Sequence, residues 1–354
     1  MAELLKPRPA VTRMAPYHPP TSGREGKLRL DFNENTIGCS PSVIARLRER
    51  LAEPTLAVYP EYEAARAAAA GFLQLEDSQF LLTNGTDEAI QVLINTFVED
   101  NDEAIVLAPS YAMYRFYADL AGAIVRAIPY RQGALDFPLE ELLAAITPQT
   151  RAILISNPNN PTGSWIELDS VRRILEAAPR AAVLLDEAYF EFCGITALGL
   201  IAAYPNLFVS RTFSKAYGMA ALRLGILASQ PRNAAFCRKA QSPYSVNLLA
   251  AIALPAAIAD AEYVRSYTEA ALSARQLLES GFRQRGIRHW PSRANFILFD
   301  AGTKAIPLRD ALRARGILVR DRSYELPGTV RVTAGTPAQT EAFFQAFDQV
   351  WPTL

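Results

Sequence analysis

The sequence predicts an α/β protein with a large, mainly parallel seven-stranded sheet domain and a smaller α+β domain. Short apolar runs alternate with helical stretches from Pro41 onward, an alanine-rich helical zone follows Pro243, and a mixed segment of strands and helices begins at Gly286. At 354 residues the chain is too long for one small core. We expect an arm over residues 1–30, a large domain over 31–250 whose first part is free to pack with the small domain, and a small domain over 251–354.

Seven apolar runs are the candidate strands of the large sheet. They lie at residues 80–83, 104–108, 124–128, 152–156, 181–186, 207–211 and 222–228. Buried strands separated by helices are typical of a sheet whose strands run mainly parallel. The first 30 residues hold prolines, glycines and basic residues without periodicity, which predicts an extended arm.

The second half of the chain changes character after the last of these strands. A helical zone is expected over residues 245–285, interrupted only near Pro255. Strands are expected at residues 295–300, 317–320 and 329–333, and helices near 308–314 and 338–350. These elements predict the small α+β domain.

The composition excludes several classes of function. Lysine plus arginine and aspartate plus glutamate each number 36, so no net charge attracts a nucleic acid or an anionic membrane. Three distant cysteines and two histidines leave little support for disulfides, metal sites or a serine–histidine–aspartate hydrolase. No apolar run has the length of a signal peptide or a membrane span. We expect a soluble cytoplasmic protein that binds no metal, nucleic acid or membrane.

The most informative segment surrounds Lys215. A strand ends in hydroxyl residues at Thr212 and Ser214, the lysine follows at once, and Arg223 stands eight positions later. A partly buried lysine at the mouth of an α/β sheet can lose its proton and bond covalently to the carbonyl carbon of a cofactor. Taken alone, the segment is more typical of a surface lysine that ends a strand, and the neighbouring motifs favour the site.

A carboxylate ends the preceding apolar run at Asp186, and Tyr189 follows three residues later. The carboxylate can keep a pyridine nitrogen protonated, and the tyrosine hydroxyl can donate to a phenolate oxygen of the same ring. Capping of the next helix is an alternative role for Asp186. Asn160 lies in a turn fixed by two prolines and a glycine, which can present its amide to a ligand.

Another strand leads directly into a helix start at Gly85, Thr86 and Asp87. The free amides of these residues would face an anion such as a phosphate, which Arg223 could close from the neighbouring strand end. An ordinary helix start is the alternative. Tyr111, viewed by itself, fits a core aromatic residue.

Together these motifs, in this order, resemble the fold-type I pyridoxal-phosphate aminotransferases, and among them the histidinol-phosphate aminotransferases. The matching segments span nearly the whole chain, at residues 33–35 with 40–41, 58–60, 84–90, 109–111, 157–163, 186–189, 214–215, 294–296 and 331–336. The sequence departs from the family pattern at residues 17–20 and 36–41, both near the entrance of the expected site.

The resemblance implies a role for each matched residue. Lys215, Asp186 and Tyr189 are implied as catalytic. The implied cofactor-binding residues are Gly85, Thr86, Asp87, Tyr111, Asn160, Asp186, Tyr189, Thr212, Ser214, Lys215 and Arg223, joined by Tyr59 from the partner subunit of a homodimer. The implied substrate-binding residues are Tyr17, Asn33, Arg320 and Arg331. For the two arginines, a surface cation on a strand is the alternative.

The implied reaction belongs to histidine biosynthesis. It transfers the amino group of L-histidinol phosphate to 2-oxoglutarate, giving imidazole acetol phosphate and glutamate, with pyridoxal 5'-phosphate as cofactor. Three alternatives stay open: an aminotransferase for aromatic or other amino acids on the same fold, a decarboxylase of a phosphorylated amino acid such as threonine phosphate, and a non-catalytic regulator that binds the cofactor.

Overall fold

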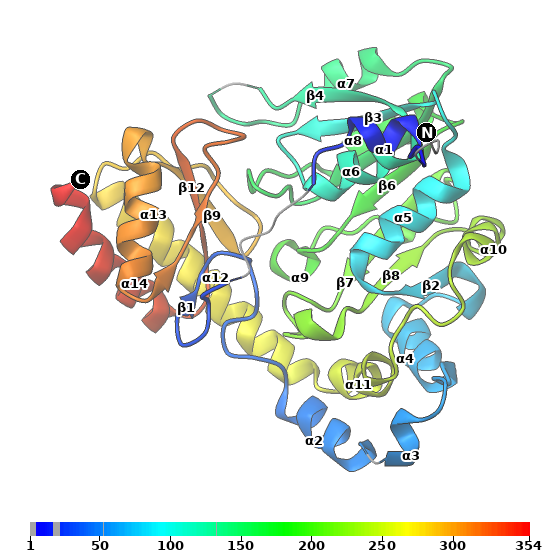
Figure 1. Ribbon diagram of the computed structural model, residues 1–354, viewed down its shortest axis with the longest axis horizontal. Coiled ribbons are helices and arrows are strands. Elements are labelled where there is room, and N and C mark those ends of the chain that lie inside the picture. Colours follow the sequence, from blue (N-terminus) through cyan, green and yellow to red (C-terminus); the bar gives the residue numbers. More distant parts are fainter. Residues whose placement is uncertain (1–4, 17–21, 52, 132) are drawn as a thin grey trace.

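A seven-stranded sheet forms the centre of the larger part of the protein in the computed structural model (Figure 1). The structure describes residues 5–16, 22–51, 53–131 and 133–354, with only the backbone at 53 and 54. The strands are β2 (Phe80–Thr83), β3 (Glu103–Ala108), β4 (Ile124–Pro129), β5 (Thr150–Ser156), β6 (Ala182–Asp186), β7 (Leu207–Thr212) and β8 (Gly225–Ala228). Their order is β2-β8-β7-β6-β5-β3-β4, and only β8 runs antiparallel to its neighbours. The predicted mainly parallel sheet of seven strands is confirmed.

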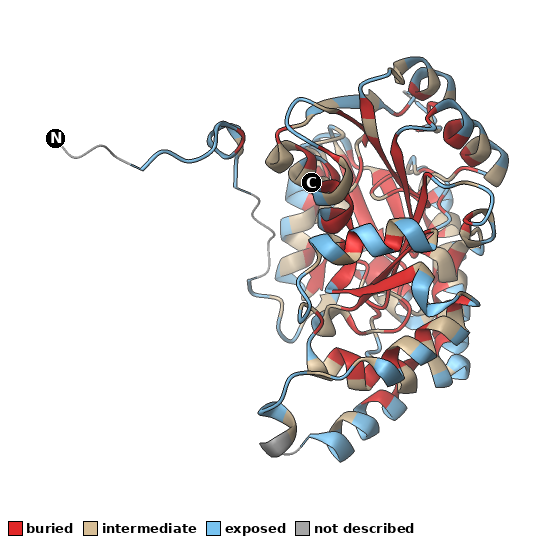
Figure 2. Ribbon diagram, turned by 90° about the vertical axis from the view of Figure 1, so that its right-hand side faces the viewer, coloured by how far each residue is buried: buried red, intermediate tan, exposed pale blue. Residues whose placement is uncertain are grey.

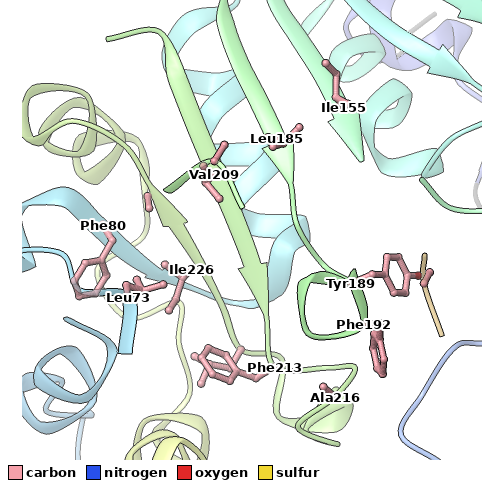
Figure 3. Close-up of a cluster of buried hydrophobic side chains, with 14 of the residues drawn as sticks. Leu73, Phe80, Ile155, Leu185, Tyr189, Phe192, Val209, Phe213, Ala216 and Ile226 are labelled. Atoms are coloured by element: carbon pink, nitrogen blue, oxygen red, sulfur yellow. The ribbon is translucent and has the colours of Figure 1, made fainter. Parts of the chain in front are cut away.

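Alternating side chains of these strands point to two separate cores. Leu185 and Val209 are paired across β6 and β7 on one face, whereas Leu184 and Phe208 are paired on the other. Figure 3 shows the first of these cores, where Ile155, Leu185 and Val209 lie on successive strands. Because both faces are buried, the inner strands read as largely apolar runs, whereas the edge strand β4 is mostly exposed.

Helices cover both faces of the sheet. The first core is covered by α4 (Glu63–Leu73), α8 (Leu168–Ala177) and α11 (Leu248–Ala259), and the second by α5 (Gly85–Phe97), α6 (Ala112–Ala121) and α10 (Pro231–Ala240). Figure 2 shows the buried strands between helices whose outer faces are exposed. The remaining elements of this part are α2 (Pro41–Arg50), α3 (Glu53–Leu56), α7 (Leu139–Ala145) and α9 (Phe190–Cys193). Within the described ranges, no helix has the length and apolarity needed to cross a membrane.

A second, smaller layer lies beside the large sheet. Its three-stranded sheet has the order β11-β12-β9 and is antiparallel throughout, with β9 (Phe296–Asp300), β11 (Arg320–Asp321) and β12 (Thr329–Thr333). It is covered by α12 (Ala261–Gln284), α13 (Ala305–Ala314) and α14 (Pro337–Val350). A cluster of phenylalanines fills its core, in which the rings of Phe282 and Phe299 stack at 4.5 Å between centroids.

Helix α12 connects the two parts. Tyr267 and Ala271 in its first half lie in the core of the large sheet, whereas Leu278 and Phe282 lie in the phenylalanine core. A single helix of 24 residues therefore fixes how the small layer faces the large one. The domain limits expected at residues 30 and 250 stay a prediction.

Several element boundaries differ from the expectation. The helical zone breaks at Asp260 and not at Pro255, because the Asp260 side chain accepts a hydrogen bond from the Tyr263 amide and caps α12, while Pro255 lies inside α11. Strand β8 begins at Gly225 and not at residue 222, since Arg223 has a left-handed backbone with φ of +53°.

Two further segments are divided in a way that the sequence did not predict. The expected strand at residues 317–320 splits into β10 (Ile317–Leu318) and β11, which pair with different partners. The first of these partners is β1 (Leu28–Arg29), which belongs to the N-terminal arm. The arm is not wholly extended, because it also contains the short helix α1 (Pro9–Arg13).

Candidate active site

A cavity of about 100 Å³ lies at the carboxyl ends of β5, β6 and β7. Parallel strands bring the residues that follow them to one edge of the sheet, which is why distant motifs meet here. The cavity is lined by Thr86, Asp87, Tyr111, Ser156, Asn160, Asp186, Ala188, Tyr189, Thr212, Ser214, Lys215 and Arg223. The predicted cofactor-binding residues therefore lie together, except Tyr59 and Gly85, and Gly85 is adjacent to the Arg223 guanidinium. No group of three or more metal-ligating side chains occurs in the described part of the chain.

Lys215 reaches into this cavity from the loop that follows β7. Its ammonium nitrogen Nζ donates a hydrogen bond to the Phe32 carbonyl oxygen at 2.9 Å, and it forms no ion pair with a carboxylate of the described residues. Burial, followed by the charge of Arg331, lowers the pKa of Lys215 to about 8. A substantial fraction of this amine is therefore neutral near physiological pH and can act as a nucleophile or a base.

Asp186 ends β6 and is only 3% exposed. Its Oδ2 accepts a hydrogen bond from the Tyr114 hydroxyl at 2.7 Å, and its Oδ1 accepts from the Ser210 hydroxyl at 3.0 Å and the Ala188 amide at 3.2 Å. Burial raises the pKa of Asp186 to about 6, against the effect of these hydrogen bonds. Among the described residues no lysine or arginine pairs with it, so this buried carboxylate is suited to a cationic ligand group.

Tyr114 and Ser210 were not predicted as site residues. A signal for each was present in the sequence. Ser210 stands two positions before Thr212 on the same strand and so points to the same side, while Tyr114 lies one helical turn after Tyr111. Neither signal identifies Asp186 as the partner.

The start of α5 and the loop after β7 form an anion-binding arrangement. Gly85 has φ of +72°, and a side chain there would bring its Cβ within 2.6 Å of the Arg223 Nη2 nitrogen. Arg223 Nη2 lies 3.0 Å from Asp87 Oδ2, and its Nη1 lies 3.5 Å from the Ser214 hydroxyl oxygen. The hydroxyl of Thr86 is buried and has no hydrogen-bond partner among the described residues. Helix amides, a guanidinium and a free hydroxyl together fit a phosphate group.

Two further predicted residues, Asn33 and Arg331, are hydrogen-bonded to the cavity-lining Tyr189 and Asn160. The side-chain amide of Asn33 donates to the Tyr189 hydroxyl oxygen at 2.9 Å, and Arg331 donates to the side-chain oxygen of Asn160. Arg331 also donates to the Asp31 carbonyl oxygen at 2.6 Å and is 4% exposed. Burial, followed by the charge of Arg322, lowers the pKa of Arg331 to about 10. A buried cation whose hydrogen bonds go to neutral oxygens fits an anionic substrate group.

The other predicted residues lie outside the cavity or outside the described residues. Arg320 is directly opposite Arg331 in the β11–β12 pair, with its guanidinium carbon 5.4 Å from the Phe32 ring centroid, and it lines a neighbouring hollow. Tyr59 is 73% exposed and stacks on Tyr244 with 4.4 Å between ring centroids. Tyr17 lies outside the described residues. Tyr111, expected to face a ring, lines the cavity and donates to Asp87 at 2.6 Å.

The chain is similar to known proteins over almost its whole length. The model of the family "Aminotransferase class I and II" matches residues 25–347. "Histidinol-phosphate aminotransferase 2" of Pseudomonas fluorescens (strain Pf0-1) is 36% identical, covering 97% of this chain and 96% of that protein. The histidinol-phosphate aminotransferase of Symbiobacterium thermophilum is 38% identical, with 96% and 97% covered.

Solved structures show the same architecture. The histidinol-phosphate aminotransferase of Sinorhizobium meliloti in complex with pyridoxal-5'-phosphate superposes with a TM-score of 0.90 at 25% identity and covers 99% of each chain. An aspartate aminotransferase of Thermus thermophilus has a TM-score of 0.82 at 22% identity and shares the fold.

Proposed function

The chain belongs to the class I and II aminotransferases, and from this membership we propose that it transfers the amino group of L-histidinol phosphate to 2-oxoglutarate. The products are imidazole acetol phosphate and glutamate, and the cofactor is pyridoxal 5'-phosphate. The relatives named as histidinol-phosphate aminotransferases support the substrate. The observation that carries the chemistry is the presence of Lys215 and Asp186 in one cavity, each without an oppositely charged partner among the described side chains.

The residues of the cavity fit this cofactor. The buried carboxylate of Asp186 suits the protonated ring nitrogen. Arg223 and the Thr86 hydroxyl, which has no hydrogen-bond partner within the described ranges, line the same cavity and suit the phosphate. We assign Tyr111 to the ring face. Asn160 and Tyr189 are assigned to the ring oxygen, and the phosphate is assigned to Thr86, Thr212, Ser214 and Arg223 with the helix start at Gly85, Thr86 and Asp87.

Pyridoxal phosphate supplies an electron sink for the charge that develops when the α-carbon of the donor loses its proton. Lys215 holds the cofactor and, once freed, its Nζ takes that proton, for which a pKa of about 8 is well matched to neutral conditions. Asp186 keeps a negative charge against the ring nitrogen in a site shielded from water. Arg331 holds the anionic group of the substrate, because its planar fork matches a phosphate or a carboxylate equally well.

We also propose a homodimer in which Tyr59 completes the partner's site. In support, Tyr59 lies in an exposed apolar segment with Leu56 and Val58 and does not line the cavity that holds Lys215 in its own chain. Apolar side chains exposed side by side are suited to burial by a second copy. The three cysteines are all free thiols, which supports the cytoplasm as the compartment.

Replacement of Lys215 tests the chemistry. Lys215→Ala is expected to lose both turnover and the absorbance of covalently held cofactor, whereas Lys239→Ala, on the exposed side of α10, should behave like the wild type. A Lys215→Ala protein that transaminates at the normal rate would contradict the assignment.

The substrate is tested separately with the loaded wild-type enzyme. Histidinol phosphate, phenylalanine and tyrosine are offered singly, and conversion of the cofactor to its amino form is followed by absorbance. We expect histidinol phosphate to react fastest. A preference for an aromatic amino acid would refute the substrate and leave transamination intact, while release of carbon dioxide would indicate a decarboxylase.

A further inference from the structure

Three arginines share one face of the short β11–β12 ribbon. Arg320 is paired directly with Arg331, and the backbone amide of Arg322 continues the ladder by donating to the Thr329 carbonyl oxygen at 2.9 Å. Because side chains alternate along a strand, Arg320 and Arg322 point to the same side as Arg331. The intervening Val330 lies in the phenylalanine core on the other side.

This face of the ribbon is turned toward the catalytic cavity. Arg331 donates to Asn160 in the cavity wall, and its guanidinium carbon lies 5.2 Å from the centroid of the Phe296 ring. Phe296 in turn meets the ring of Tyr189 edge-on at 5.4 Å. Arg322 stands two positions beyond Arg320, the strand partner of Arg331, and on the same side of the ribbon, and its positive charge contributes to the lowered pKa of Arg331.

Arg322 is itself an incompletely partnered buried cation. It is 7% exposed and forms an ion pair with Glu325, but its Nε–H is buried and has no hydrogen-bond partner among the described residues. The Nε–H of Arg331 is in the same state. A buried donor without an acceptor is destabilising, so these groups are suited to a ligand with several acceptor oxygens.

The charges on this face are unbalanced. Among the side chains that the structure describes, the three arginines are opposed by the single carboxylate of Glu325, which leaves two positive charges in excess. The neighbouring carboxylates of Asp31 and Glu34 are paired with Arg24, and that of Asp321 points to the other side, toward Arg309. A phosphate monoester carries nearly two negative charges at neutral pH and a carboxylate carries one. The excess matches the phosphate.

We propose that Arg322 is a specificity residue that selects phosphate-bearing amino donors over carboxylate-bearing substrates, with Glu325 as the counter-ion that the phosphate displaces. The proposal deepens the proposed function and rests on it. It adds a residue that none of the sequence motifs identified. Arg331 can serve both substrates, whereas the second positive charge from Arg322 benefits chiefly a dianionic group.

The test compares Arg322→Gln with Arg265→Gln in the cofactor-loaded enzyme. Arg265 forms an exposed ion pair with Glu262 at the same sequence spacing, on α12, and is the matched control. We measure the KM for histidinol phosphate and for 2-oxoglutarate, and the inhibition constants of methyl phosphate and acetate. In Arg322→Gln the two phosphate constants should rise at least about tenfold and the two carboxylate constants by less than about twofold, with kcat nearly unchanged. Equal changes in both classes, or an unchanged phosphate constant, would overturn the proposal.

Glu325→Gln provides a second test, in which the inhibition constant of methyl phosphate should change in the opposite direction. It tests the role of Arg322 even if Arg322→Gln does not fold. Removal of the competing carboxylate should lower the inhibition constant of methyl phosphate severalfold, and an unchanged or higher constant would overturn the proposal. If the wild-type enzyme rejects histidinol phosphate, the proposed function fails. The inhibition by methyl phosphate and acetate, measured with whichever amino donor is accepted, then still decides the role of Arg322.

Discussion

The hydrogen bond from Tyr114 to Asp186 offers a direct test of how the site controls its charge. The Tyr114 hydroxyl is fully buried and donates to Asp186 Oδ2 at 2.7 Å, while the other carboxylate oxygen is held by Ser210 and the Ala188 amide. Tyr114→Phe removes one oxygen atom and keeps the ring that packs in the core beside α5. The carboxylate then keeps two of its three donors.

The hydrogen bond from Tyr114 favours the charged form of Asp186, and this determines the direction and size of the pKa shift expected in Tyr114→Phe. A donated hydrogen bond stabilises the charged carboxylate and lowers its pKa, so its loss raises the pKa of Asp186 above its value of about 6. A buried hydrogen bond to a charged acceptor contributes about 1.5 to 3 kcal/mol, which corresponds to about 1 to 2 pH units. Between pH 6 and the raised pKa of about 7 to 8, the variant should therefore carry mostly the neutral acid where the wild type carries mostly the carboxylate.

The assay is the affinity of the cofactor-free protein for pyridoxal phosphate, measured by absorbance between pH 5 and pH 9. The affinity should fall as the pH is lowered and Asp186 becomes protonated. The pH at the midpoint of this fall should be about 1 to 2 units higher in Tyr114→Phe than in the wild type. Tyr117→Phe, on the same helix but not bonded to Asp186, is the control and should keep the wild-type midpoint. Coincident midpoints for Tyr114→Phe and the wild type would refute the reasoning.

Two further predictions concern stability and the phosphate end of the site. Asp186→Asn should raise the free energy of unfolding of the cofactor-free protein at pH 8 by up to about 3 kcal/mol, because a carboxyl pKa raised from about 4 to about 6 destabilises the folded state above pH 6. In urea unfolding this gain should shrink as the pH falls from 6 to 4, and a gain that is constant with pH would exclude ionisation as its cause. Gly85→Ala should weaken cofactor binding at least about tenfold, since its Cβ displaces the guanidinium of Arg223 and its backbone is left-handed. Gly71→Ala in α4, where a Cβ meets nothing within 4 Å, should leave binding unchanged.

Most of the sheet was predictable because its strands are buried on both faces. A continuous apolar run such as 182–185 identifies such a strand, and the polar residue that ends the run, here Asp186, lies at the edge where ligands bind. The same reasoning identified Thr212 and the helix start at Gly85. The limits of β8 were missed because the left-handed backbone of Arg223 is set by tertiary contacts and not by residue type.

The supporting residues of the site could not be predicted in the same way. Tyr114 is 72 positions from Asp186 in sequence and Ser210 is 24 positions away, so their hydrogen bonds depend on the order of strands and helices in space. The orientation of Arg322 depends on its pairing with Thr329, which a two-residue strand does not encode by periodicity. The local sequence pattern predicts where a strand ends. The hydrogen-bond partner of a side chain can be predicted only when the pairing register of the strands is known.

The cavity and the β11–β12 ribbon contain buried side chains of both charges, and their burial lowers the stability of the folded protein. Asp186 is a buried carboxylate without a cation among the described residues, Lys215 has a lowered pKa, and Arg322 and Arg331 exceed the one carboxylate that faces them. Burial of unpaired charge is destabilising, so the apolar cores of the large sheet and of the small layer must supply the compensating stability. A ligand that brings a cationic ring nitrogen to Asp186 and a phosphate to the arginines removes this cost in proportion to its charge complementarity. The same imbalance that weakens the protein therefore makes its binding selective for charge.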